Sequence, residues 1–335
     1  MPKGQGNSAR NNSSSRIFAS QSSLNTYFKH ICDILRRSNC QTALKYVPEL
    51  TWILFLRILD ETERREHEQH IALGLSYSPS LSTPYRWSDW AAPDGPKRQE
   101  LQNGAMGGLF HFINNELIPY LRGLRERPGA TIRQRVISEI MSGIEKTQVE
   151  TEKNFLDVID KVHVIRFVSI DTQHIFALSQ VYESLLLRMG EKKNDGGQFF
   201  TPREVIRAIV RVVNPIIGET VHDPTCGTGG FLAQAYEYMA GPANVNVETA
   251  DQLQILKERT FYGREKDNTI YPISLANLVL HGIDAPHIWH GNTLSGTETY
   301  GGLYSGAPNL FDVVLMNPPF GGKEGKEVQD RFAYR

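Results

Sequence analysis

The feature that most constrains the fold is a short apolar run near the C-terminal end that stops at two prolines. Residues 313–316 read Val-Val-Leu-Met, which is typical of a buried parallel β-strand. Asn317, Pro318 and Pro319 follow, and the strand must end there because proline cannot donate a hydrogen bond to a sheet ladder. The run therefore predicts an open α/β sheet with Asn317 at its carboxyl edge, where such sheets bind their ligands.

The groups that follow this strand are suited to holding a base. The side-chain amide of Asn317 and the free carbonyl of Pro318 can accept both hydrogens of an exocyclic amino group, and Phe320 can stack on the ring that carries it. Bases flipped out of a duplex are read by this combination of hydrogen bonds and stacking. A strand that ends in a rigid turn and binds nothing is the alternative interpretation. Asn-Pro-Pro-Phe resembles the catalytic motif of amino-methyltransferases that use S-adenosylmethionine and modify adenine or cytosine in DNA.

A glycine-rich turn earlier in the chain predicts a cofactor site. Residues 220–231 read Thr-Val-His-Asp-Pro-Thr-Cys-Gly-Thr-Gly-Gly-Phe, and a strand, a glycine turn and a helix form a nucleotide-binding element. The spacing is not that of the dinucleotide fingerprint, and no lysine follows the glycines as in a phosphate loop. S-adenosylmethionine would suit the turn, because Asp223 could face its ammonium and backbone amides its carboxylate. A purely structural turn is the alternative.

Two more strand ends extend this site. Residues 261–265 predict the second strand, and Glu265 at its end could accept hydrogen bonds from both ribose hydroxyls, as acids do in dinucleotide folds. An exposed acid at a strand end is the alternative for Glu265. Residues 269–280 predict the next helix, and residues 288–294 predict a third strand edge, where Asn292 could read the amino group of the cofactor's adenine.

Two helices are predicted before the glycine turn. An apolar stripe between Ile175 and Met189 predicts the first. The second begins at residue 201, where Thr201 is a good N-cap and Pro202 takes the favoured first helical position. Glu204 completes a capping box with Thr201.

The N-terminal half predicts a helical domain. Residues 1–22 are rich in Ser, Asn and Gly and are predicted to be disordered. A helix begins at about Ser23, and a second follows Pro48 and ends before a charged run. The remaining segments are a loop-like stretch with Trp87 and Trp90 as anchors over residues 76–108, and two further helices over residues 110–124 and 131–144.

Composition excludes several classes of protein. Apolar residues make up 40% of the chain and charged residues 22%, and no segment has the roughly 20 consecutive apolar residues that span a bilayer. Three cysteines without metal-ligand spacing favour the reduced cytoplasm. Glu66, His67 and His70 do not have the zinc-protease spacing, so no metal site is predicted. A net charge of −1 is unusual for a DNA enzyme and suggests either one basic face or another subunit that grips DNA.

Together these segments resemble the modification (methyltransferase) subunit of type I restriction-modification systems, of the N6-adenine DNA methyltransferase family. The resemblance covers most of the chain and rests on Leu-Thr-Trp-Ile-Leu-Phe-Leu-Arg-Ile-Leu-Asp, Gly-Gln-Phe-Phe-Thr-Pro, Asp-Pro-Thr-Cys-Gly-Thr-Gly-Gly-Phe and Asn-Pro-Pro-Phe-Gly, in that order. It implies an α/β fold in which an all-helical N-terminal domain over residues 23–165 precedes a Rossmann-like, S-adenosylmethionine-dependent methyltransferase domain over residues 166–335. Relatives continue beyond the catalytic motif, so we expect that domain to be truncated at its C-terminus.

The resemblance also implies the residues of the site. The cofactor-binding residues would be Phe200, Thr201, Asp223, Gly227, Gly229, Glu265 and Asn292. The catalytic residues would be Asn317, Pro318, Pro319 and Phe320. Asn292 stands where many relatives carry Asp, which would weaken an adenine contact without abolishing it.

The expected activity is methyl transfer from S-adenosylmethionine to the exocyclic amino group (N6) of a flipped adenine in double-stranded DNA. The family implies a DNA-specificity subunit as partner, and a restriction (nuclease or translocase) subunit as a further one, in the cytoplasm and away from any membrane. Because the catalytic domain is expected to be truncated, we expect no activity from this chain alone. Two alternatives stay open, namely a non-catalytic assembly or regulatory remnant of such a subunit and a protein-glutamine methyltransferase.

Overall fold

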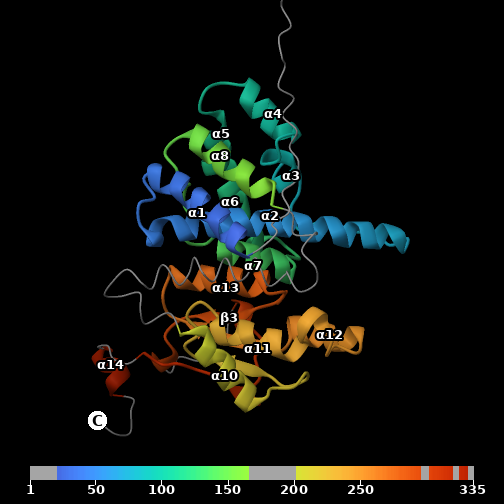
Figure 1. Cartoon of the computed structure of the whole chain (residues 1–335), viewed down its shortest axis with the longest axis vertical. Coiled ribbons are helices and arrows are strands. Elements are labelled where there is room, and N and C mark those ends of the chain that lie inside the picture. Colours follow the sequence, from blue (N-terminus) through green and yellow to red (C-terminus); the bar gives the residue numbers. More distant parts are fainter. Residues whose placement is uncertain (1–20, 166–200, 296–301, 320–323, 331–335) are drawn as a thin grey trace, which may run out of the picture.

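The computed structural model describes residues 21–165, 201–295, 302–319 and 324–330 (Figure 1). Residues 1–20 of the predicted tail, the predicted helix between Ile175 and Met189, and the predicted site residues Phe200 and Phe320 lie outside the described residues. The last two residues of the predicted tail, 21 and 22, are helical, so the first helix begins earlier than predicted. Within the described residues, a helical domain comes first in the chain and an α/β domain follows.

Helices make up the first domain, as predicted. They are α1 (Gln21–Arg37), α2 (Ala43–Ala72), α3 (Trp87–Trp90), α4 (Pro96–Asn103), α5 (Gly108–Phe112), a π-helical turn (Ile113–Leu117), α6 (Ile118–Arg122), a 3₁₀ turn (Leu124–Glu126), α7 (Ile132–Ile140) and α8 (Glu152–His163). Thr131 caps α7 through a capping box with Gln134. Trp87 and Trp90 are fully buried, which confirms them as anchors.

Two expectations for this domain were wrong. Helix α2 does not start after Pro48 but at Ala43, and it continues through the charged run to Ala72. Proline costs the helix one hydrogen bond near its start, but Tyr46 and Val47 before it are buried, and their packing offsets that loss. The stretch 76–108 is not only loop, because it contains α3 and α4, the latter with Pro96 at its first position.

The second domain is built on a parallel sheet with the strand order β3-β2-β1-β4. Its strands are β1 (Val221–Asp223), β2 (Phe261–Glu265), β3 (His287–His290) and β4 (Val313–Val314), and its longer helices are α10 (Arg203–Val213), α11 (Gly230–Ala240), α12 (Ala250–Glu258) and α13 (Ile270–Leu280), with the short α14 (Lys326–Gln329) near the end. The first and fourth strands pair side by side, in the register Val221 to Val313. The order in which strands are added to the sheet reverses between β1 and β4, and open α/β folds bind ligands at such a point.

Strand β4 is not buried on both faces, contrary to the prediction. Val313 and Leu315 are buried, but Val314 is 54% exposed and Met316 is 41% exposed. Within the described residues the strand forms the edge of the sheet, and only one of its faces is covered. Its apolar run therefore alternates between a covered and an open face.

Helix α10 starts one residue later than predicted. Arg203 is its first residue and Pro202, not Thr201, is its N-cap. The predicted capping box is therefore wrong. The proline holds Thr201 outside the α region, and the Thr201 hydroxyl is engaged elsewhere, by Asn317.

The two domains share one hydrophobic core. Helix α13 lies along the base of the helical domain and packs against α7 and α2 (Figure 1). Buried residues from both domains, from Phe28 in α1 to Leu315 after β4, form a single cluster. The Tyr271 hydroxyl also donates to the Glu139 carboxylate across the boundary, at 3.4 Å. Among the described residues, none of the helices combines the length and the apolar character that crossing a membrane requires.

Candidate functional site

A cavity of about 690 Å³ opens at the carboxyl ends of the four strands. This is within the roughly 300–1,000 Å³ of pockets that bind small molecules. Its wall combines residues from the glycine turn, the ends of β2 and β3, the start of α10 and the segment after β4. Most of the predicted site residues line it, namely Thr201, Asp223, Gly227, Glu265, Asn292, Asn317, Pro318 and Pro319. Gly229 lies outside that lining.

The glycine turn depends on two left-handed backbone positions. Gly227 has φ +54° and Gly229 has φ +78°, conformations that residues with a Cβ adopt at a cost. Cys226 anchors the turn to β2, because its N–H donates to the Arg264 carbonyl at 2.9 Å. A Cβ on Gly229 would also lie 3.1 Å from the Leu278 side chain in α13. Gly229 therefore lets the turn sit closely on α13, behind the wall of the cavity.

Asp223 is the most deeply buried acid in the cavity wall. It ends β1, is 1% exposed, and accepts a hydrogen bond from the Thr225 N–H at 3.0 Å. Burial, reinforced by the nearby Glu265 carboxylate, raises the pKa of Asp223 to about 7. A buried carboxyl without a cationic neighbour would be stabilised in its charged form by a ligand cation.

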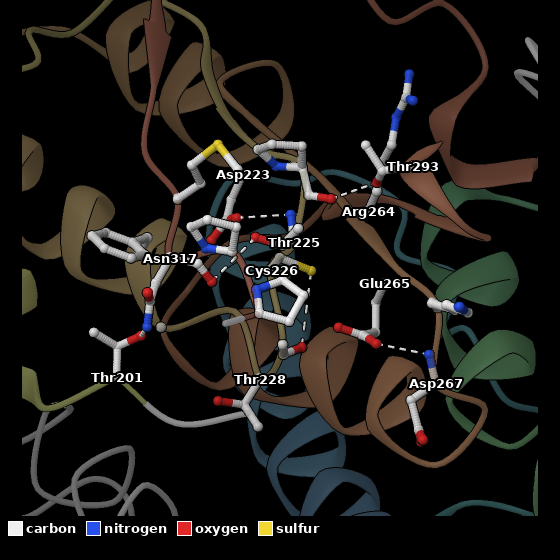
Figure 2. A pocket seen from close by; sticks show the side chains of 18 of the residues that line it. Thr201, Asp223, Thr225, Cys226, Thr228, Arg264, Glu265, Asp267, Thr293 and Asn317 are labelled. Carbon is white, nitrogen blue, oxygen red and sulfur yellow. Dashed lines mark hydrogen bonds between the residues drawn. The ribbon is translucent and has the colours of Figure 1, made fainter. Parts of the chain in front are cut away.

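Glu265 ends β2 beside the same cavity. One of its carboxylate oxygens accepts the Asp267 N–H at 2.7 Å, and burial raises the pKa of Glu265 above its ordinary value. Figure 2 shows the Glu265 carboxylate on the opposite side of the pocket from Asn317. A polar ligand that spans the cavity would therefore meet an acid at one side and the Asn-Pro-Pro segment at the other.

Asn317 is held from two directions. Its side-chain Nδ2 donates to the Thr201 Oγ1 at 3.0 Å, and the Thr225 hydroxyl lies 3.5 Å from its backbone carbonyl oxygen. Figure 2 shows the Asn317 amide directed at Thr201. Because the nitrogen of the amide faces Thr201, its oxygen is left for other partners.

Asn292 is bonded within the protein. Its Nδ2 donates to the Glu324 carboxylate at 2.8 Å, and its Oδ1 accepts the Leu294 N–H at 3.0 Å. Glu324 also accepts from the Lys266 Nζ at 2.9 Å, so it connects the ends of β2 and β3 with the segment after β4. A carbonyl oxygen has two lone pairs, so Asn292 Oδ1 retains capacity for one more donor.

Glu324, Lys266 and Thr225 were not predicted as residues of this pocket. Glu324 and Lys266 belong to short charged segments, and nothing in the sequence distinguishes them from ordinary surface charges. Thr225 lies inside the glycine motif, and its position two residues after Asp223 could have indicated that it belongs to the pocket. No cluster of metal-ligating side chains occurs in the described part of the chain, and Glu66, from the rejected zinc motif, pairs with Arg133.

Comparison with known proteins gives the family. Residues 173–335 match the family described as N-6 DNA Methylase, and residues 24–162 match the HsdM N-terminal domain. Together the two matches span most of the chain.

Curated relatives agree with these matches. The chain is 31% identical to the type I restriction enzyme EcoEI methylase subunit of Escherichia coli, over 92% of this chain and 59% of that protein. It is 28% identical to the StySJI methylase subunit of Salmonella typhimurium, over 91% of this chain and 51% of that protein. The chain thus spans between half and three fifths of the length of these relatives.

A solved structure agrees in fold and sequence. A modification subunit of a type I restriction enzyme from Vibrio vulnificus YJ016 superposes with a TM-score of 0.77 and 32% identity, covering 95% of this chain and 65% of that one. Both domains, the order of the motifs and the parallel sheet are therefore accounted for by one kind of protein. The chain belongs to the family of modification (methylase) subunits of type I restriction-modification systems.

Proposed function

We propose that the chain carries the catalytic site of a DNA methyltransferase that transfers a methyl group from S-adenosylmethionine to N6 of adenine. The observation that carries this proposal is that one cavity joins the glycine turn with Asp223 and the Asn317-Pro318-Pro319 segment. A methyltransferase of this kind needs a donor site and an acceptor site within bonding distance of each other.

The residues at the glycine turn fit S-adenosylmethionine. The buried Asp223 carboxyl has no cationic partner among the neighbours that the structure describes, and the ammonium of the cofactor's amino-acid end would supply one. Glu265 would accept hydrogen bonds from the ribose hydroxyls, and Asn292 Oδ1 would accept one from the adenine amino group. Gly227, with φ +54°, lets the backbone approach the ligand closely. When bound, the cofactor would supply an electrophilic methyl group.

The residues after β4 would hold the acceptor. Asn317 Oδ1 and the Pro318 carbonyl accept the two hydrogens of the adenine amino group, which points the nitrogen lone pair at the donor. These hydrogen bonds strengthen as positive charge develops on the nitrogen, so they stabilise the transition state more than the ground state. Phe320 lies outside the described residues, and its stacking on the base remains part of the proposal.

We further propose that other subunits complete the enzyme in the cytoplasm. The relatives are named as subunits of type I restriction enzymes, and a solved structure that is 37% identical to this chain concerns the complex assembly of the type I R-M system. The net charge of −1 supports a specificity subunit that grips the double-stranded DNA, with a restriction subunit as a further partner. The match to the HsdM N-terminal domain speaks against a protein-glutamine methyltransferase.

Two substitutions test the division between donor and acceptor sites. In the assembly with the specificity subunit, Asn317→Ala should reduce adenine methylation to a small residual rate while calorimetry still records normal S-adenosylmethionine binding. Asp223→Ala should weaken cofactor binding itself, because the ammonium loses its charge partner. Wild-type turnover by Asn317→Ala, or unchanged cofactor affinity in Asp223→Ala, would contradict the assignment of the respective site. An assembly that binds the cofactor but never methylates would support the non-catalytic alternative.

A further inference from the structure

The proposed role of Asn317 requires its side-chain amide to have one particular orientation. To accept an amino hydrogen, the amide must present its oxygen to the base, because its nitrogen would present hydrogens to other hydrogens. The amide nitrogen must then find an acceptor on the opposite side, since a buried or half-buried donor without a partner costs free energy. The Thr201 Oγ1 is that acceptor, 3.0 Å from Asn317 Nδ2.

The backbone and the side chain of Thr201 are both restricted in conformation. Pro202 follows it and restricts its backbone to extended conformations, and its branched Cβ limits its side chain to few rotamers. Its hydroxyl accepts from Asn317 Nδ2, whereas the N-cap of α10 is Pro202. The hydroxyl is therefore committed to Asn317 and not to the helix that follows.

The start of α10 is also fixed relative to the glycine turn. Arg203 is buried, and a Cβ added to Gly230 would lie 1.7 Å from its guanidinium, so the arginine lies directly over this glycine. Helices α10 and α11 pack against each other. Thr201 thus lies just before a helix whose position is set by the donor side of the cavity, while its hydroxyl reaches the acceptor side.

We propose that Thr201 is a positioning residue for the acceptor, which orients the Asn317 amide so that its oxygen faces the target amino group. This inference rests on the proposed function and deepens it. It differs from the cofactor contact that the family resemblance implies for Thr201, because the partner is the amide of the catalytic motif. In this role Thr201 affects the rate at which a bound base reacts and leaves cofactor binding unchanged.

The test compares Thr201→Val with Thr201→Ser in the methyltransferase assembly. Valine keeps the shape and the branched Cβ but removes the acceptor, whereas serine restores the hydroxyl. We expect Thr201→Val to lower kcat by roughly ten- to a hundredfold, the scale of a misplaced reacting group, with S-adenosylmethionine affinity unchanged. Thr201→Ser should recover most of the rate. Thr249→Val is the matched control, because Thr249 caps α12 and should alter stability but not kcat.

A double mutant separates positioning from a structural effect. If Thr201 acts through Asn317, Thr201→Val should change the residual rate of Asn317→Ala by less than about twofold. An equal loss of rate in both backgrounds, an unchanged kcat in Thr201→Val, or no recovery by serine would overturn the inference while leaving the proposed function in place. A wild-type assembly without adenine methylation would overturn both. Thermal unfolding of each variant checks that the protein is folded.

Discussion

Asp223 is deeply buried and yet has no cationic partner among the described groups around it, a combination that is rare in an acid without a function. It is 1% exposed, and the groups described around it are a backbone N–H, the Thr225 side chain and the like-charged Glu265. Burial therefore holds its pKa at about 7, so that half of the molecules carry the charge near neutral pH. Such a carboxyl responds strongly to any cation that enters the cavity.

We therefore predict that S-adenosylmethionine affinity depends on pH. Below pH 7 Asp223 becomes protonated, so affinity should fall by roughly tenfold for each further pH unit. Above about pH 8 the cofactor's α-amino group loses its proton, and affinity should fall again. Calorimetry from about pH 5.5 to about pH 9 measures this profile, and Asp223→Asn should remove its acidic limb. An acidic limb that persists in Asp223→Asn would assign the titration to another group.

The same shift has an opposite effect on the unliganded protein. The folded-state pKa of Asp223 is raised above its unfolded value of about 3.9, so the folded state binds more protons between about pH 4 and 7. The stability that this proton contributes is present below about pH 4 and is lost as the pH rises toward 7. Cofactor binding would reverse that trend, because the ammonium stabilises the ionised carboxylate.

At this scale the sequence predicts residue types well and partners poorly. Asp223, Glu265, Asn292 and Asn317 all line one cavity, because each lies at or just after the end of a recognisable strand. The partner of Thr201 was not foreseen, because the capping box depends only on local spacing, whereas the bond to Asn317 joins residues 116 positions apart. Local rules cannot weigh a tertiary hydrogen bond against a helix cap.

Among the elements, the glycine turn between β1 and α11 has the strictest backbone requirement. We predict that Gly229→Ala destabilises the fold by about 1–3 kcal/mol, because φ +78° disfavours any Cβ and the new methyl group would press on Leu278 and Ser274. Gly74→Ala is the matched control. Gly74 also has a positive φ, +68°, but has nothing within 4 Å of a Cβ, so it isolates backbone strain from crowding.

Denaturant unfolding of both variants measures the difference. Gly229→Ala should lose more stability than Gly74→Ala by the amount that crowding adds. Equal losses would mean that α13 moves aside without cost and that the close approach of the turn to α13 is not a constraint on the fold.

Element boundaries show where sequence patterns are sufficient. The strand at 261–265 and the helix at 269–280 were predicted within one residue, since the strand starts with two aromatic residues and ends on an acid, and the helix is a mostly apolar run. Pro48 misled the start of α2, because a proline is tolerated near a helix start when the turn before it is buried. The open face of β4 does not follow from the apolar run itself, because such a run does not report which of its faces a neighbour covers.

The whole molecule is organised around α13. This helix belongs to the α/β domain by sequence, but its residues are buried on nearly all sides because the helical domain covers what solvent would otherwise reach. Ile273, Leu275 and Leu278 lie in the same core cluster as residues of α1 and α2. The two domains therefore stabilise each other, although the sequence suggests two separable units.

We predict from this shared core that the two domains unfold in one cooperative transition. The three cysteine thiols report it separately, because Cys32 and Cys40 are buried in the helical domain and Cys226 in the glycine turn. Thiol labelling at increasing urea, read by mass spectrometry, should give all three the same midpoint. Leu275→Ala, at the centre of α13, should lower that midpoint for all three together, by about 2–5 kcal/mol in stability. Labelling of Cys226 at a lower urea concentration than Cys32 and Cys40 would show instead that the α/β domain unfolds on its own.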